Sequence, residues 1–425
     1  MQKHALILSF VSALSILTVN ACAQGTNVWT NVTPAGLDMA ASLGNDNFGV
    51  QDVVVDPVRP ADCYAFTCHQ GVWKSTDFGA TWHGPINTGA GGAVLANGKQ
   101  WGAAIDNNPK RDPSTPPTLW TANGNAACGV LKSTDGGVSW TAYSMHNALA
   151  AAYNGYYAED SYDFDLDPYD NKHLIAGFHA YGISESFDGG VTWHDAQNVT
   201  NAFGGSLYVF FVNTGDSATT RGTWVAVSDQ DGTGTWATKN SGATWKQVGN
   251  WGHPHGSDQL FNAGNGVAYV GGNQGVFKTT DAGQNWTNVY NKDNGVIGTP
   301  TTLYTSFSFP GGPGATYDPG LSSAPRNPGT SWSLMGNPAG MTNGMKRASV
   351  TFDGTRYIIV AGCWNSGIWR YVEQTSTGVV VTKSAGARSA SKLGSAKISI
   401  GTSRTLIVEK DNVLYDVKGR NIETR

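Results

Sequence analysis

One stretch of this 425-residue chain reads Ser75-Thr76-Asp77-Phe78-Gly79-Ala80-Thr81-Trp82, and close copies of it recur downstream. Asp followed two residues later by Gly is typical of a tight turn, because the carboxylate accepts nearby backbone N–H groups and Gly adopts backbone angles that other residues resist. In the copies, the closing Trp stands at positions 82, 140, 193, 245, 286 and, in a degenerate copy, 332. Successive copies lie 41 to 58 residues apart, and this spacing predicts one supersecondary unit per repeat.

Short β-rich segments flank these turns. One leads into the phrase, as in Gly71-Val72-Trp73-Lys74, and another lies upstream, as in Val53-Val54-Val55. Strands and turns at this period are typical of a four-stranded propeller blade. Six phrases give six blades, residues 345–371 give a seventh without the phrase, and residues 28–32 can supply the last strand of that blade. We therefore expect an all-β fold, a seven-bladed β-propeller spanning residues 24–373.

The repeated phrase resembles the Asp box, or BNR repeat, of sialidases, sortilin-type receptors and the xyloglucanases of glycoside hydrolase family 74. Spacing and residue types agree in several copies, and the repeats cover most of residues 26 to 373. In these families the box lies in peripheral hairpins, away from the catalytic centre. The resemblance therefore implies a structural role for the carboxylates of the boxes, Asp77, Asp135, Asp188 and Asp281.

The two ends of the chain differ from the repeats. Lys3 precedes an apolar run from residue 5 to 19, and Ala21-Cys22-Ala23 offers small residues for cleavage, so residues 1–23 are predicted to be a signal peptide. The protein is then secreted or held at the surface of a bacterium, with a lipid anchor at Cys22 as an alternative. Residues 374–391, rich in Ser, Ala and Gly, are predicted to be a linker. Residues 392–425 are predicted to form a short C-terminal β segment, which is either a small sorting domain or an accessory strand pair.

The distribution of net charge along the chain indicates which classes of molecule the protein can bind. The whole chain carries −4, but the tail from Lys383 carries +5 and the leader +1, which leaves −10 for residues 24–382. Nucleic acids and acidic polysaccharides normally need a basic footprint. We therefore expect a neutral polysaccharide or glycan as the partner, with no nucleic acid, no transmembrane segment after the leader, no cofactor and a monomeric chain.

Four cysteines follow the leader, namely Cys63, Cys68, Cys128 and Cys363. An exported protein can form disulfides, but the sequence does not fix their pairing. Cys68 and Cys363 fall in equivalent loops of the first and seventh blades, which are neighbours in a closed ring. A bridge between them, closing the ring, is therefore one hypothesis.

In a propeller, the loops leading into the innermost strands and the loops joining second and third strands share one face. Aromatic, amide and acidic groups gather in those loops, and such groups suit sugars because aromatic rings stack on sugar faces while polar groups bond the hydroxyls. The predicted substrate-binding residues are His69, Gln70, Trp101, Tyr162, His179, Tyr181, Gln230, His255, Gln274, Arg347, Trp364 and Asn365.

Glycosidases need two carboxyl groups about 5 to 10 Å apart. The acidic segment from Asp160 to Asp170 resembles the family 74 context in which an acidic strand leads into an Asp-Pro turn, and alternation along the strand favours Asp160 and Asp163 over Asp165. The other family position aligns with residues 67–71, where this chain has no carboxylate. The predicted catalytic residues are Asp160, Asp163, Asp52 and Asp258.

Three functions remain open from the sequence. The first is a glycoside hydrolase related to the xyloglucanases, which acts through these paired carboxylates. The second is a non-catalytic propeller that binds a glycan or protein at the cell surface. The third is a uronate lyase with His255 or His179 as base, Tyr181 or Tyr162 as acid, and Lys346 or Arg347 neutralising the uronate. We predict no metal, because a loop with two histidines such as residues 253–258 is more typical of hydrogen-bonded scaffolding.

Overall fold

The structure is a computed structural model that describes residues 25–40, 46–122, 128–229, 234–252, 259–272, 274–292, 295–374, 397–400, 406–410 and 413–415. The chain divides into two compact units, residues 1–375 and 376–425. The predicted leader and all but the first residue of the predicted linker lie outside the described residues. In the second unit, three antiparallel strands form one sheet, β28 (Lys397–Ile400), β29 (Leu406–Lys410) and β30 (Val413–Tyr415).

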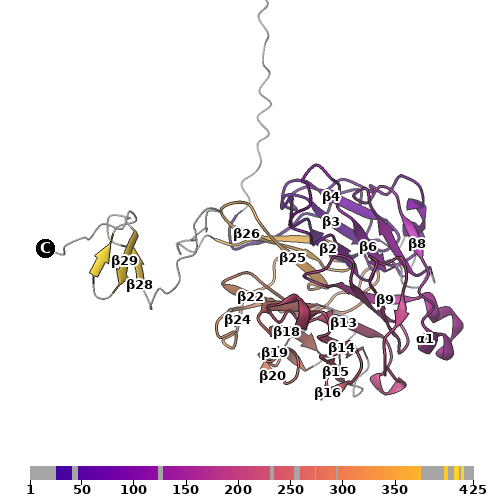
Figure 1. Ribbon diagram of the computed structural model, residues 1–425. Coiled ribbons are helices and arrows are strands. Elements are labelled where there is room, and N and C mark those ends of the chain that lie inside the picture. The colour runs from indigo at the N-terminus through magenta and orange to yellow at the C-terminus, as the bar shows by residue number, and fades with distance from the viewer. Residues whose placement is uncertain are drawn as a thin grey trace, which may run out of the picture. The chain divides into compact units, whose positions relative to one another are not determined.

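Seven antiparallel sheets follow one another around a ring in the first unit (Figure 1), which confirms the predicted seven-bladed β-propeller. Blade 1 contains β2 (Val50–Val55), β3 (Cys63–Thr67) and β4 (Val72–Ser75). Blade 2 contains β5 (Ala103–Ile105), β6 (Leu119–Ala122), β7 (Val130–Ser133) and β8 (Thr141–Tyr143). Blade 3 contains β9 (Ser161–Leu166), β10 (Leu174–Phe178), β11 (Ile183–Ser186) and β12 (His194–Asp195).

The chain continues around the ring in the same order. Blade 4 contains β13 (Leu207–Phe211), β14 (Trp224–Ser228), β15 (Thr235–Thr238) and β16 (Lys246–Gly249). Blade 5 contains β17 (Leu260–Gly264), β18 (Val267–Gly272), β19 (Gly275–Thr279) and β20 (Thr287–Tyr290). Blade 6 contains β21 (Gly295–Gly298), β22 (Thr302–Ser306), β23 (Ser322–Pro325) and β24 (Ser333–Leu334). Blade 7 contains β25 (Arg347–Phe352), β26 (Tyr357–Gly362), β27 (Ile368–Val372) and, from the start of the chain, β1 (Trp29–Asn31).

Strand β1 closes the ring. It pairs antiparallel with β27, with Trp29 opposite Tyr371, as the sequence predicts. The innermost strands of blades 7 and 1, β25 and β2, also contact each other. The hypothesis of a closing disulfide is wrong in this structure, because Cys68 and Cys363 are both buried free thiols. Backbone pairing closes the ring in place of a covalent bond, and full closure leaves only short strand edges.

The few helices lie in loops between strands. The α-helices are α1 (Ala148–Tyr153) and α2 (Ser217–Thr220), and the 3-10 helices are η2 (Gly92–Asn97), η3 (Gly155–Glu159) and η4 (Asn201–Phe203). Helix α1 begins where the Asn147 side chain accepts a hydrogen bond from Ala150 N, and it projects at the edge of the ring (Figure 1). Within the described ranges, no helix has both the length and the apolar character to span a membrane.

The repeated turn joins the third strand of a blade to the fourth. In blade 3, Asp188 Oδ1 accepts hydrogen bonds from Ser186 Oγ at 3.0 Å and from Thr192 N at 2.9 Å, and Gly190 N donates to Ser186 Oγ at 2.9 Å. The copies in blades 1, 2, 4 and 5 repeat these three bonds, with Asn240 in place of Asp in blade 4. Partial burial alone would raise the pKa of Asp188, but these bonds overcome it and hold the pKa at about 2.

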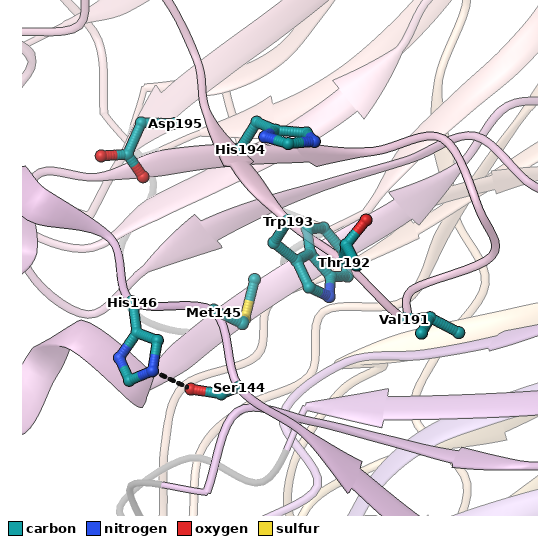
Figure 2. Close-up of a pocket in the computed structure, with 8 residues that line it drawn as sticks. All are labelled: Ser144, Met145, His146, Val191, Thr192, Trp193, His194 and Asp195. Atoms are coloured by element: carbon teal, nitrogen blue, oxygen red, sulfur yellow. Dashed lines mark hydrogen bonds between the residues drawn. The ribbon is translucent and has the colours of Figure 1, made fainter.

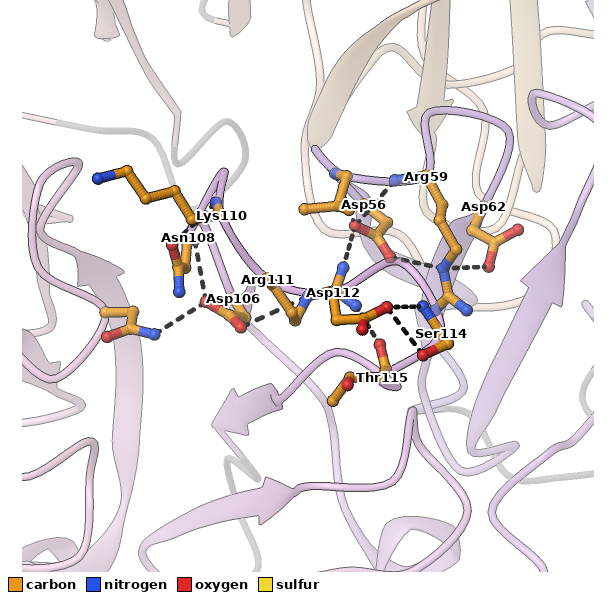
Figure 3. A network of polar contacts seen from close by, with 12 residues as sticks. Asp56, Arg59, Asp62, Asp106, Asn108, Lys110, Arg111, Asp112, Ser114 and Thr115 are labelled. Atoms are coloured by element: carbon orange, nitrogen blue, oxygen red, sulfur yellow. Dashed lines mark hydrogen bonds and ion pairs between the residues drawn. The ribbon is translucent and has the colours of Figure 1, made fainter.

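A buried ionic network ties the turns of blades 1 and 2 (Figure 3). The guanidinium of Arg111 donates to Asp56 and lies 3.5 Å from Asp106 Oδ2, and all three residues are buried. Arg59 adds contacts of 3.1 Å to Asp56 and 3.3 Å to Asp62. Burial favours the neutral form of Asp56, but the bond from Arg111 outweighs it and lowers the pKa of that carboxyl. The ion pair of Arg111 with Asp56 therefore joins blade 2 to blade 1, and the pair of Arg59 with Asp62 reinforces blade 1.

The hydrophobic core lies between neighbouring blades. A typical cluster packs Trp120 of blade 2 against Phe164 and Leu174 of blade 3, together with Trp193 from the repeated turn. The indole nitrogen of Trp193 donates to Gly190 O at 3.2 Å, which aims its ring into this cluster. The Trp of the phrase therefore links a local turn to the packing between blades.

We expect replacement of Asp188 by Ala to destabilise the propeller by about 1–2 kcal/mol, because Ser186 and Thr192 lose their acceptor. Asp188→Asn should cost less, since Asn240 makes the same bonds in blade 4. Urea unfolding at pH 7 measures both variants. Because the pKa of Asp188 is about 2 in the fold, against an ordinary value of 3.8, its contribution should be complete above about pH 4 and lost as the pH falls towards 2. Equal stability of the Ala variant and the unmodified protein would contradict this role.

Candidate functional site

The acidic strand β9 carries its carboxylates on the face opposite its core residues. Tyr162, Phe164 and Leu166 are buried in hydrophobic clusters, so alternation puts Asp163 and Asp165 together on the other face. Asp165 Oδ2 accepts a hydrogen bond from Phe211 N of blade 4 at 2.8 Å. The sequence argument that set Asp163 apart from Asp165 was therefore wrong.

Arg347, the first residue of β25, reaches two of the predicted catalytic carboxylates. Its Nη1 lies 3.3 Å from Asp52 Oδ2, and its Nη2 donates to Asp163 Oδ1. Asp52 Oδ2 also accepts Ala103 N at 2.8 Å. The side chains of Asp52, Asp163 and Arg347 are 3%, 0% and 11% exposed. One guanidinium from blade 7 therefore neutralises buried carboxylates of blades 1 and 3 at the centre of the ring.

The predicted sugar-stacking aromatics beside this centre are buried. Trp101, Tyr162 and Trp364 are 5%, 2% and 1% exposed. Their rings pack on one another, with centroids 5.3 Å apart for Trp101 and Tyr162 and 5.8 Å apart for Trp101 and Trp364. Lys346 donates to Trp101 O, and its Nζ lies 5.3 Å from the Trp364 ring centroid. In this structure protein atoms cover the faces of these three rings, which leaves no open ring surface for a sugar.

Asp160 and His179 form a pair at the start of β9. Asp160 is fully buried, and its Oδ2 lies 3.0 Å from His179 Nδ1, while His179 N donates to Asp160 O at 3.1 Å. The imidazole stacks on Tyr162, with ring centroids 5.0 Å apart, and meets the ring of Tyr157 edge to face at 5.1 Å. The His179 side chain remains 23% exposed. The buried carboxylate therefore fixes the orientation of a partly exposed imidazole.

His179 opens into a cavity of about 210 Å³, which we call the tyrosine pocket. The insertion between β8 and β9 supplies one wall, since Tyr153 ends α1 and Tyr157 belongs to η3. The loops after β10 and before β13 supply the other wall. The lining residues are Tyr153, Tyr157, His179, Ala180, Tyr181, Gly205, Ser206 and Asp229.

The other predicted binding residues that the structure describes do not line this pocket. Gln70 accepts Asp38 N at 2.7 Å, His69 lies 3.5 Å from Asp46, and Asn365 donates to Ala315 O at 2.8 Å. Gln274 is exposed in blade 5. Three further predicted residues, Asp258, Gln230 and His255, lie outside the described residues. Of the predicted residues within the described ranges, the pocket brings together His179 and Tyr181, with Asp160 behind them.

Sequence reasoning missed Tyr153, Tyr157, Ser206 and Asp229 as pocket residues. The signal for the first two was the run Tyr153-Asn154-Gly155-Tyr156-Tyr157, which interrupts the repeat just before the acidic strand. Asp229 stands in the loop between second and third strands of blade 4, which is the kind of loop that marked the other candidates. No local pattern marks Ser206.

A second hollow, about 500 Å³ in volume, lies beside Ser144, His146 and Asp195 (Figure 2). Ser144 Oγ lies 2.8 Å from His146 Nε2, and His146 Nδ1 lies 2.6 Å from Glu159, an arrangement similar in outline to a nucleophilic triad. However, Ser144 Oγ also donates directly to the same Glu159 oxygen, so the carboxylate does not stand behind the imidazole as a triad requires. His146 is also 81% exposed. This cluster is better described as a hydrogen-bonded loop.

Across the described ranges, no three His, Cys, Asp or Glu side chains gather as a possible metal site. The four cysteines after the leader are free thiols, and burial raises the pKa of the Cys68 thiol to about 12. Such a thiol stays protonated and unreactive at neutral pH.

No family model and no curated protein matches the chain. Among solved structures, it is similar to YCF48 bound to D1 peptide, at 13% identity and a TM-score of 0.52, covering 81% of this chain and 97% of that one. It is also similar to the GH74 xyloglucanase from Xanthomonas campestris, at 18% identity and a TM-score of 0.53, covering 81% of this chain. A third similar structure is the WD40 β-propeller domain of Doa1, at 11% identity and a TM-score of 0.50, covering 82% of this chain and 99% of that one.

These likenesses concern the fold. This chain spans about half, 53%, of the solved xyloglucanase chain. Enzyme, peptide-bound and WD40 propellers therefore share this architecture at low identity, and the function of the chain has to be argued from its own side chains.

Replacing Arg347 by Gln should destabilise the propeller by about 3–5 kcal/mol, because it leaves the buried carboxylates of Asp52 and Asp163 without their cation. Arg356→Gln is the matched control. Arg356 pairs with Asp353 at 2.9 Å but is 36% exposed, so its loss should cost less than about 1 kcal/mol. Urea unfolding at pH 7 compares the two variants. Equal losses of unfolding free energy in the two variants would show that the central ion pair stabilises the propeller no more than an exposed ion pair does.

The carboxyl group of Asp165 should give the stability of the propeller a second dependence on pH. Burial raises the pKa of Asp165 to about 6, although the bond from Phe211 and the charge of Arg347 oppose that rise. The protonated carboxyl therefore favours the folded state below about pH 4, and this contribution is lost as the pH rises through 6. Asp165→Asn should remove this loss and be more stable at pH 7.5 by at most about 3 kcal/mol. Identical pH profiles of stability for both proteins, from pH 4 to 7.5, would contradict this assignment.

Proposed function

We propose that this protein is an exported, non-catalytic propeller that binds a glycan through the tyrosine pocket. The repeated turns are, in this proposal, Asp boxes that brace the scaffold. The observation that carries the proposal is the contrast between the two groups of predicted site residues. The carboxylates and rings around the Arg347 ion pair are buried and engaged with protein, whereas tyrosines and a histidine line an accessible cavity formed by loops of blades 3 and 4 and by the insertion before β9.

The chemistry of the pocket suits a sugar. Tyr153 is 61% exposed, and aromatic faces stack on the apolar face of a sugar ring. His179 and Asp229 add groups that can bond hydroxyls, and a cavity with aromatic walls and a few polar groups is the usual form of a small-ligand site. Tyr181 has a left-handed backbone, with φ of 65°, and its N–H donates to Gly205 O at 3.0 Å. Such strained positions in rigid loops are frequent at binding sites.

Hydrolysis is less well supported than binding. An inverting glycosidase needs one protonated carboxyl and one carboxylate facing the substrate. Asp52 and Asp163 instead share one guanidinium, and Asp160 holds an imidazole. A uronate lyase needs a cation beside its base, but the pocket lining contains neither Lys nor Arg, and Lys346 and Arg347 bond to Trp101 and to the central carboxylates. Among the residues that the structure describes, neither reaction has its full set of groups in one place.

Affinity electrophoresis of the purified protein in gels that contain polysaccharides tests this proposal. We expect retardation by at least one glycan, and a loss of about tenfold in affinity for Tyr153→Ala, a typical effect for an exposed aromatic anchor. Tyr169→Ala is the matched control, because Tyr169 is 46% exposed in the turn after β9 and should leave affinity unchanged.

The same glycans are incubated with the protein while reducing ends and unsaturated-uronate absorbance are followed. We expect neither signal. New reducing ends that disappear in Asp163→Asn would overturn the proposal in favour of a hydrolase. Absorbance that disappears in His179→Ala would favour a lyase.

A further inference from the structure

We propose that the tyrosine pocket recognises a protonated amine, so that its ligand is a glycan of amino sugars with free ammonium groups. This inference rests on the proposed glycan binding and narrows it to a class of ligand. It is carried by the arrangement of the rings, by the charge of the lining and by the hydroxyl groups at its rim.

Three tyrosine rings and the His179 ring lie in contact along the lining of the pocket. Tyr153 meets Tyr181 edge to face, with ring centroids 5.1 Å apart and an interplanar angle of 73°, and it lies 5.7 Å from Tyr157. Tyr157 in turn meets His179 at 5.1 Å and 72°. Tyr153 lines the cavity and is 61% exposed, so part of its ring surface stays open to a ligand. An open aromatic face attracts organic cations.

Apart from His179, which pairs with Asp160, the charge of the described lining is negative. Asp229 is the acidic residue of the lining, and the buried Asp160 lies directly behind His179. None of the eight lining residues is Lys or Arg. A carboxylate ligand would therefore meet a negative potential, whereas an ammonium group is attracted both by the carboxylate and by the rings. The net charge of −10 over residues 24–382 favours the approach of a cation from a distance as well.

The acidic group is held in position. Ser206 N donates to Asp229 Oδ1 at 2.8 Å, and Asp229 N donates to Ser206 O at 3.0 Å. This reciprocal pair fixes the carboxylate against the loop before β13. A carboxylate fixed in this way loses little conformational freedom on binding, so it favours tight and selective recognition.

The tyrosine hydroxyls of the pocket favour an amino sugar over a ligand that offers an ammonium group alone. Among the described residues, the hydroxyls of Tyr153, Tyr157 and Tyr181 make no hydrogen bond to protein, so they can bond ligand hydroxyls. A lysine side chain would offer the ammonium group but no hydroxyls. Hydroxyls and an ammonium group on one ring are the chemistry of glucosamine.

Isothermal titration calorimetry with three tetrasaccharides tests this inference. The probes are a β-1,4-linked glucosamine tetramer, its fully N-acetylated form and the corresponding glucose tetramer, at a pH where the amine is protonated. We expect the glucosamine tetramer to bind at least about tenfold more tightly than the other two, and this preference to shrink as salt is added. Tyr153→Ala should weaken binding of any tetramer that binds the unmodified protein.

The variant Asp229→Asn tests whether the negative charge of Asp229 causes the preference for the amine. Asn can still accept the bond from Ser206 N, so the loop keeps its shape while the preference for the amine is lost. Asp170→Asn is the charge-matched control, since Asp170 lies in the turn beyond β9 and pairs with Arg221 at 3.5 Å, and the preference should remain.

The outcomes separate this inference from the function on which it rests. Equal binding of all three tetramers, with loss in Tyr153→Ala, would overturn the inference and leave glycan binding intact. Preference for the amine that survives in Asp229→Asn would also overturn it. Binding of none of the tetramers would overturn the inference, and if no polysaccharide retards the protein either, the proposed function fails with it.

Discussion

The interaction on which the centre of this propeller depends is the ion pair of Arg347 with Asp52 and Asp163. The guanidinium comes from blade 7, and its two partners belong to blades 1 and 3, so one side chain joins three inner strands. Each partner is almost fully buried, where an unpaired charge is strongly unfavourable. The same arrangement that stabilises the ring therefore pairs both carboxylates with a protein cation.

The structure thus contains buried, paired side chains at the centre of the ring and an open pocket lined by tyrosines. Central groups are buried, charged and paired, and the repeated turns at the edge of the blades anchor their Trp rings between sheets. The tyrosine pocket is built differently, from an insertion between blades 2 and 3 and from loops of blades 3 and 4. Loops on a rigid scaffold are the usual place for a binding site, because they can vary without disturbing the sheets. This arrangement explains why a common fold says little about what this chain binds.

The blades could be predicted from the sequence because their signal is local. The repeated turn spans eight residues, and each bond of Asp188 is made within four residues of it. The site could not be predicted in the same way. Arg347 lies 184 residues from Asp163 and 295 from Asp52 in the sequence. No local sequence pattern around any of the three residues predicts that they pair. Alternation along β9 puts residues two positions apart on one face, so it gives no reason to set Asp165 apart from Asp163, and both accept bonds from beyond their own blade.

Burial of Trp101, Tyr162 and Trp364 was missed for a similar reason. A Trp in a loop reads as an exposed stacking platform, yet these rings pack on one another across blades 2, 3 and 7. The run of tyrosines lies in an insertion that interrupts the repeat. Such an interruption of a regular period is a signal for a binding loop, whereas residues that fit the period mainly form the scaffold.

The position of a bound glycan is the most direct test of the account. A crystal structure of the protein with an oligosaccharide that it binds would locate the ligand relative to the two groups of residues. We predict a sugar ring against Tyr153 and Tyr181, with the ion pair of Arg347 unchanged. A glycan lying across the centre of the ring, with Arg347 displaced and a glycosidic oxygen beside Asp163, would contradict the account and identify the centre as the active site.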